Sequence, residues 1–150
     1  VENEDYAAML ARFDGGAVGV FESSRIAIGP RSEYALEVYG TRGSLRWSFQ
    51  RLNELELADD RSGYRTIMAG PGFGEFARFQ PGAGTSMGFD DLKTIEAALF
   101  LRSVAEGRQL APSAADAWAT AEVADAALAS ASSGSWVPVP AVSGPTTYDA

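Results

Sequence analysis

The chain has 150 residues, 46% of them hydrophobic and 21% charged, which is the composition of one globular domain. Its net charge of −8 argues against nonspecific binding to nucleic-acid phosphates, and no apolar run is long enough to span a membrane. Cysteine and histidine are both absent, which excludes disulfides, thiolate nucleophiles and every histidine-based catalytic arrangement.

Two strands are predicted at the start of the chain. Residues 5–13 form the first, and Asp14-Gly15-Gly16 is a turn of the kind that closes hairpins. The second strand is expected over residues 17–28, although its later part is unusually polar for a position within a sheet. Pro30 ends it, because proline has no N–H to donate to a strand ladder.

The clearest hairpin lies at residues 33–49. Leu36 and Val38 point to one face and Glu37 and Tyr39 to the other, which is the period-2 alternation of a half-buried strand, and glycines flank the turn. Two further strands are predicted over 54–58 and 64–68. Since all six strands are joined by short turns, their pairing must be antiparallel.

Residues 69–88 predict a long loop rich in glycine and phenylalanine, and loops of this length are usually functional or poorly ordered. A first helix is expected from an N-cap at Asp90 to Glu106. A capping box at Ser113-Ala114-Ala115-Asp116 predicts a second helix, which ends near Ser133. Its buried stripe is expected to contain Trp118, Ala121, Leu128 and Ala131.

A short last strand at 135–139 and a polar, flexible tail over 141–150 complete the predicted elements. Together they predict an α+β fold, with an antiparallel meander of about six strands and two helices packed on one face. The other face carries tyrosine, serine, glutamate and arginine. We expect this open face to form a homo-oligomer, since broad exposed faces of this kind are commonly interfaces.

Three sequence signals have simple structural interpretations. The glycines of residues 70–74 lack the spacing and the following helix of a dinucleotide-binding loop. Asp90 and Asp91 are placed to cap a helix and to favour its dipole, and Asp59-Asp60 fits a turn. We therefore predict no metal site at either acidic pair.

Arg25, Arg31 and Lys93 are candidate substrate-binding residues, because they are predicted close to likely cavities. They could donate hydrogen bonds to a polyhydroxylated ligand. They could equally be subunit contacts or solvated edges, since arginine is common at interfaces. The residues alone leave both alternatives open.

Several motifs in order resemble the Gfo/Idh/MocA oxidoreductases, which include glucose–fructose oxidoreductase and inositol dehydrogenases. The resemblance covers residues 5–139. Leu36-Glu37-Val38-Tyr39-Gly40-Thr41-Arg42-Gly43-Ser44-Leu45 resembles the family's "E-I-Y-G-T-x-G-S-L" hairpin. Similar runs are found at residues 9–25, 100–108, 114–117 and 133–137.

The resemblance implies the C-terminal domain of such an enzyme, over residues 1–140. In the family, a Rossmann domain binds NAD or NADP and carries a catalytic lysine in an "E-K-P" motif, and a "D-x-x-x-H" segment supplies an acid/base pair. This sequence contains none of these elements. We therefore expect no catalytic, cofactor-binding or metal-ligating residue in it, and we expect it to be a fragment that is inactive alone.

The resulting hypothesis is a cytoplasmic substrate-binding and oligomerisation domain of an NAD(P)-dependent oxidoreductase that acts on a sugar, inositol or related polyol. The alternative is a free-standing sheet module that forms dimers without enzymatic activity. The sequence does not determine the substrate, the choice between NAD and NADP, the direction of reaction or the size of the oligomer.

Overall fold

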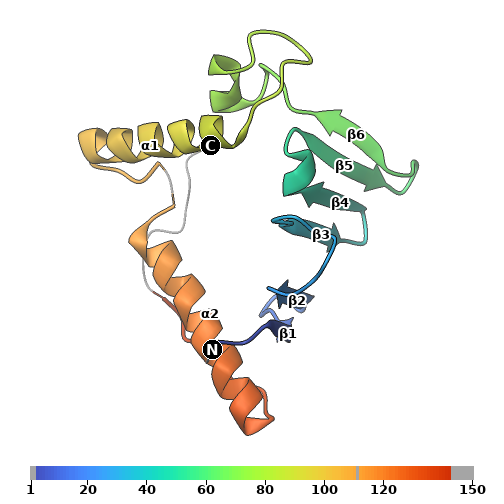
Figure 1. Cartoon of the computed structure of the whole chain (residues 1–150), viewed down its shortest axis with the longest axis vertical. Helices are drawn as coiled ribbons and strands as arrows, with labels where there is room; N and C mark the ends of the chain where they lie inside the picture. Colours follow the sequence, from blue (N-terminus) through green and yellow to red (C-terminus); the bar gives the residue numbers. More distant parts are fainter. Residues whose placement is uncertain (1–2, 111, 143–150) are drawn as a thin grey trace. The chain divides into compact units, whose positions relative to one another are not determined.

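The computed structural model describes residues 3–110 and 112–142, and the chain divides into two units. The first unit comprises Val1–Gly29 and Pro112–Ala150, and the second comprises Pro30–Ala111. Each unit contains one antiparallel sheet and one long helix (Figure 1). Within the described residues, six strands and two α-helices confirm the predicted α+β class.

In the first unit, strands β1 (Tyr6–Arg12) and β2 (Val18–Ser24) form an antiparallel hairpin. The second strand ends four residues before the predicted boundary at Ile28. The cause is Ser24, whose Oγ accepts hydrogen bonds from the backbone N–H groups of Ile26 at 3.4 Å and Ala27 at 3.1 Å. A serine that satisfies the next N–H groups in this way turns the chain out of the ladder.

Helix α2 (Ala114–Ser133) begins and ends as predicted. Ser113 Oγ accepts from the backbone N–H groups of Ala115 and Asp116, while the Asp116 carboxylate accepts from the Ser113 N–H at 2.7 Å. This reciprocal pair is the capping box. Gly134 ends the helix at φ 65°, a left-handed conformation that glycine adopts without steric cost.

Two further predictions for this unit were wrong. Residues 135–139 form no strand; instead the Arg12 guanidinium lies 4.4 Å from the centre of the Trp136 ring. The predicted stripe on α2 is exposed at Trp118 and Leu128, and the half-buried stripe is Ala115, Ala119, Glu122, Ala126 and Ser130. The flexible tail predicted from residue 141 lies mostly outside the described residues.

The second unit contains a four-stranded sheet in sequence order: β3 (Ala35–Tyr39), β4 (Gly43–Ser48), β5 (Glu54–Asp59) and β6 (Arg65–Met68) (Figure 1). All neighbouring pairs are antiparallel. The six strands therefore form two sheets. Between the two sheets, Gly29, with φ 117°, and Ser32, with φ 49°, adopt turn conformations incompatible with a continuous strand.

A run of aromatic rings connects this sheet to helix α1 (Phe89–Glu106). Tyr34, Trp47, Phe49 and Phe89 meet edge to face, with successive centroids 6.0, 6.2 and 6.1 Å apart. Such pairs stabilise beyond their buried area. The run fixes the start of α1 against the end of β4 and the following short 3-10 helix η1 (Phe49–Arg51).

Helix α1 begins before the predicted N-cap. Gly88 is the N-cap, because its N–H donates to the Asp91 carboxylate at 2.8 Å, and Asp90 lies inside the first turn. The predicted end is correct, since Gly107 adopts φ 64°. No helix in the described part of the chain is long and apolar enough to cross a membrane.

The Asn53 side chain holds the long loop of residues 69–88 onto the sheet. Its Nδ2 donates to the Met87 carbonyl and its Oδ1 accepts from the Met87 N–H, both at 2.9 Å. Oδ1 also accepts from Gln80 at 3.3 Å. Gln80 is fully buried and Met87 is 5% exposed, so these bonds are shielded from water. The loop, which contains the 3-10 helix η2 (Gly74–Arg78), thus has a fixed attachment.

We predict that Asn53→Ala lowers the free energy of unfolding by about 2–3 kcal/mol, because it leaves the buried polar groups of Gln80 and Met87 without partners. Gln50→Ala is the matched control, since its amide hydrogen bonds are exposed. Urea unfolding followed by circular dichroism measures both. Equal losses in the two variants would contradict the role given to Asn53.

Candidate functional site

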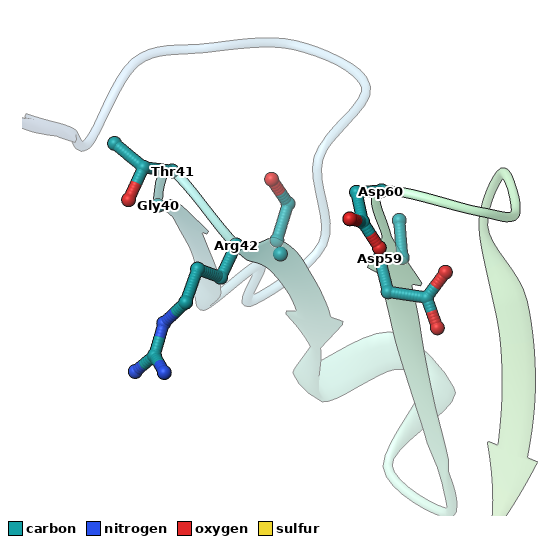
Figure 2. Close-up of a pocket in the computed structure, with 8 residues that line it drawn as sticks. Gly40, Thr41, Arg42, Asp59 and Asp60 are labelled. Atoms are coloured by element: carbon teal, nitrogen blue, oxygen red, sulfur yellow. The ribbon is translucent and has the colours of Figure 1, made fainter.

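A shallow depression of about 160 Å³ lies where the β3–β4 turn meets the end of β5 (Figure 2). The side chain of Arg42 points away from Asp59 and Asp60 in this view, so the charged groups do not converge. A Cβ on Gly43 would lie 2.7 Å from the Ala58 carbonyl oxygen, so glycine permits the close approach of β4 and β5 here. The depression is therefore a consequence of strand packing and carries no catalytic arrangement.

Asp59 stabilises the turn after β5, as its position predicted. Its Oδ1 accepts from the backbone N–H groups of Arg61 and Ser62, both at 2.9 Å, and from Ser62 Oγ at 3.0 Å. These bonds favour the ionised carboxylate, and the N–H of Arg61 contributes most to lowering the pKa of Asp59 below its ordinary value. The prediction that Asp59 lies in a turn and supports it is confirmed.

The glycine-rich segment at residues 70–74 is a plain loop, as predicted. It follows β6, the edge strand of its sheet, and leads into the 3-10 helix η2 instead of opening an α-helix. A dinucleotide-binding loop requires a helix N-terminus directed at the phosphates.

Asp91 acts at the start of α1 as a capping group, as expected from the sequence.

The predicted substrate-binding residues come from different parts of the chain. Arg25 directly follows β2, and its backbone N–H donates to the Asp5 carbonyl at 2.8 Å. Arg31 lies in the loop before β3, where its carbonyl accepts from Gln50 Nε2 at 3.4 Å. Both side chains are exposed. Their backbone positions are thus fixed while their guanidinium groups remain available.

Lys93 lies one turn into α1. Its Nζ donates to the Glu96 carboxylate at 2.7 Å and lies 5.5 Å from the centre of the Phe89 ring. Arg31 belongs to the same unit, and no hydrogen bond or ion pair joins it to Lys93 among the described residues. Lys93 is therefore held in place by its own helix.

A cluster that the sequence did not single out lies on one face of the four-stranded sheet. We call it the polar sheet face; its members are Glu37, Tyr39, Arg46, Glu56, Tyr64 and Thr66. The Arg46 guanidinium lies 4.2 Å from the centre of the Tyr64 ring, and its Nη2 donates to Tyr39 Oη at 3.2 Å. That hydrogen bond is the main reason that the pKa of Arg46 is raised.

The alternation of the sequence already placed Glu37 and Tyr39 on one face, but the position of Arg46 beneath them depends on the register of the hairpin. Glu37 is the cross-strand partner of Arg46, and the carboxylate lies 3.6 Å from Arg46 Nε. Arg51 likewise forms an ion pair with Glu54. Arg46 and Arg51 are therefore both paired with acids of the same unit.

Groups of three or more metal-binding side chains are absent from residues 3–110 and 112–142. The described residues present exposed cations on a fixed backbone and one polar sheet face. Such features can bind and orient a ligand or another protein surface.

The sequence profile of the oxidoreductase family C-terminal alpha/beta domain matches residues 1–139. This chain belongs to the Gfo/Idh/MocA oxidoreductase family. The match confirms the resemblance drawn from the ordered motifs, of which the hairpin at residues 36–45 is the centre.

Known members of the Gfo/Idh/MocA family align with nearly the whole chain. Levoglucosan dehydrogenase of Pseudarthrobacter phenanthrenivorans is 36% identical over 148 residues, which is 95% of this chain and 38% of that protein. Structures of levoglucosan dehydrogenase with NADH and levoglucosan, or with NADH and L-sorbose, are 35% identical over 95% of this chain and superimpose with a TM-score of 0.89. This chain covers 40% and 39% of them, respectively.

An NAD binding oxidoreductase from Klebsiella pneumoniae is 32% identical over 94% of this chain and 39% of its own, with a TM-score of 0.87. The chain thus spans about two fifths of the length of these relatives.

The lowered pKa of Asp59 predicts a pH-dependent contribution to stability. A carboxylate with a depressed folded-state pKa stabilises the fold above its unfolded pKa, and this stability is lost as the pH falls through the folded value. Asp59→Asn should therefore lower the melting temperature at pH 7, and the difference from the native protein should narrow as the pH falls below the ordinary aspartate pKa of about 3.9. Thermal unfolding between pH 2 and pH 7 measures it.

Asp60→Asn is the matched control, because the Asp60 carboxylate makes no hydrogen bond among the described residues. Its melting temperature should follow that of the native protein at every pH. A gap for Asp59→Asn that stays constant down to pH 2 would show that the carboxylate charge does not stabilise this turn.

Proposed function

We propose that this chain is the substrate-binding and oligomerisation domain of an NAD(P)-dependent dehydrogenase that oxidises or reduces a sugar, inositol or related polyol. The observation that carries the proposal is the alignment of 95% of the chain with levoglucosan dehydrogenase at a TM-score of 0.89. The structures of that relative contain NADH with levoglucosan or with L-sorbose. The match favours an enzyme domain over a free-standing sheet module.

The residues of this chain do not fit a dinucleotide. Its glycine-rich segment, residues 70–74, follows an edge strand and precedes a 3-10 helix, so it lacks the helix N-terminus that binds pyrophosphate. Histidine, the commonest general base, is also absent. We therefore assign coenzyme binding and proton transfer to a Rossmann domain in the remainder of a longer polypeptide. Residues 1–140 would then form one C-terminal domain.

The part that we assign to this chain is recognition of hydroxyl groups. Arg25, Arg31 and Lys93 are the proposed donors. Their backbones are held by hydrogen bonds to Asp5 and Gln50 and by the first turns of α1. A fixed backbone reduces the entropy lost when a long side chain binds a ligand. Charged donors also make stronger hydrogen bonds to hydroxyl oxygens than neutral donors do.

We further propose that the polar sheet face forms a homo-oligomer. Tyrosine and arginine are the residue types that most often dominate binding energy in protein interfaces, and this face presents Tyr39, Arg46 and Tyr64 together. The lack of cysteine accords with the cytoplasmic location that we propose.

The function predicts a measurable activity. The full-length gene product that contains this chain should change absorbance at 340 nm when supplied with NAD or NADP and a panel of levoglucosan, myo-inositol, glucose and sorbitol. Residues 1–150 alone should give no turnover with any of them. Turnover by the isolated chain, or failure of the full-length protein to bind either coenzyme, would contradict the proposal.

The substrate-binding residues predict a selective effect on KM. Arg25→Ala, Arg31→Ala and Lys93→Ala should each raise KM for the polyol by about tenfold or more, since each removes a charged hydrogen bond to the ligand. Arg61→Ala is the control, because the Arg61 side chain makes no ion pair among the described residues. If a variant leaves KM unchanged in steady-state assays, its residue is a solvated edge and not a substrate contact.

A further inference from the structure

Arg46 lies in a row of residues that crosses all four strands of the second unit. The register pairs Glu37 of β3 with Arg46 of β4, Arg46 with Glu56 of β5, and Glu56 with Thr66 of β6. Cross-strand partners share one face of a sheet. The two central strands therefore present an arginine and a glutamate side by side at the middle of the polar sheet face.

Arg46 is held rigidly but leaves most of its hydrogen-bonding capacity unused. Tyr64 lies under the guanidinium at 4.2 Å, and Tyr39 accepts a single hydrogen bond from Nη2. Arginine has five N–H donors. Arg46 Nε is closed to solvent and lies 3.6 Å from the Glu37 carboxylate, so another molecule can approach only the terminal nitrogens. The Arg46 side chain as a whole is 41% exposed. A second carboxylate can therefore reach the guanidinium.

The two glutamates beside Arg46 differ in their partners. Glu37 accepts a hydrogen bond from Tyr39 and lies 3.6 Å from Arg46. Glu56 makes no hydrogen bond or ion pair among the described residues, although it is half-buried. Glu56 is therefore the carboxylate of this row that can pair with a cation from another molecule.

This arrangement is complementary to itself. Consider two copies stacked with their polar sheet faces together and related by a two-fold axis. The axis lies in the interface plane, parallel to the strands and midway between β4 and β5. It places β4 of each copy over β5 of the other. Each β4 residue then lies over the cross-strand β5 residue of the other copy, which is the reciprocal contact of an isologous interface. Small side chains next to the row, Ser44 and Ala58, allow the sheets to approach to about 10 Å.

We propose that a second copy of this chain packs on the polar sheet face about this axis, so that Arg46 of each copy forms an ion pair with Glu56 of the other. The inference rests on the proposed oligomerisation and adds its register and its two determining residues. Tyr39, Tyr64 and Glu37 are positioning residues, because they fix the guanidinium that the second copy contacts.

Charge reversal in the full-length gene product tests the register. Arg46→Glu alone places carboxylates opposite each other across the axis, and Glu56→Arg alone places guanidinium groups opposite each other. Each should weaken self-association about 100-fold or more, since like charges facing each other across an interface are strongly repulsive. An equimolar mixture of the two variants should assemble with a Kd within about tenfold of the native value, because both opposing pairs are then of opposite sign.

Analytical ultracentrifugation gives the Kd values, and native mass spectrometry of differently tagged chains identifies the mixed species. Arg65→Glu is the matched control, because Arg65 is the cross-strand partner of Leu57 on the other face; its Kd should not change. If either single variant fails to fold, the double variant Arg46→Glu/Glu56→Arg tests the register instead. Its Kd for self-association should equal that of the native chain, because both ion pairs are restored with their charges exchanged.

The outcomes separate the two proposals. A monomeric native protein overturns oligomerisation through this face and with it the register. A native oligomer whose single variants self-associate normally overturns only the register, and leaves another surface as the interface. The crossed Arg46–Glu56 pairing is also overturned if the mixture of single variants and the double variant both stay dissociated.

Discussion

The second unit depends on one side chain, the amide of Asn53. Its donor and acceptor both pair with the backbone of Met87, and its oxygen also accepts from the buried Gln80. The backbone carbonyl of Asn53 accepts from the Ala69 N–H at 2.7 Å, where the long loop begins. One residue before β5 thus fixes both ends of a loop of about twenty residues, and with them the start of α1 that carries Lys93.

This attachment matters because apolar burial within the described chain is small. Leu36 and Val38, on the sheet face opposite Arg46, are 52% and 47% exposed, and Phe100 on α1 is 62% exposed. Apolar faces of this extent mark surfaces that another protein surface covers. The proposed function accounts for them, since a longer enzyme would supply further structure. The face that carries Leu36, Val38 and Trp47 is mostly apolar, whereas the polar sheet face carries charged and tyrosine side chains.

Most of the elements could be predicted because they depend on local chemistry. Alternation located β3 to β6 within about two residues, and the capping box at Ser113 with the glycine at Gly134 defined α2. The boundary errors at Ser24 and Gly88 came from local side-chain hydrogen bonds, and the larger errors occurred where distant contacts decide. Residues 135–139 read as a strand but have no neighbouring strand, and Trp136 packs under Arg12 instead. On α2, alanine is so frequent that composition did not reveal which stripe would be half-buried.

The sequence by itself determined the family, the α+β class and the absence of histidine-based chemistry, because ordered motifs, hydrophobic period and residue counts are properties of the chain alone. Tertiary structure decided which residues meet. The three tyrosine and arginine side chains of the polar sheet face are spread over residues 39–64, and only the pairing of β3, β4 and β5 brings Glu37, Arg46 and Glu56 into one row. Register depends on turn geometry and cross-strand packing, which no single strand encodes.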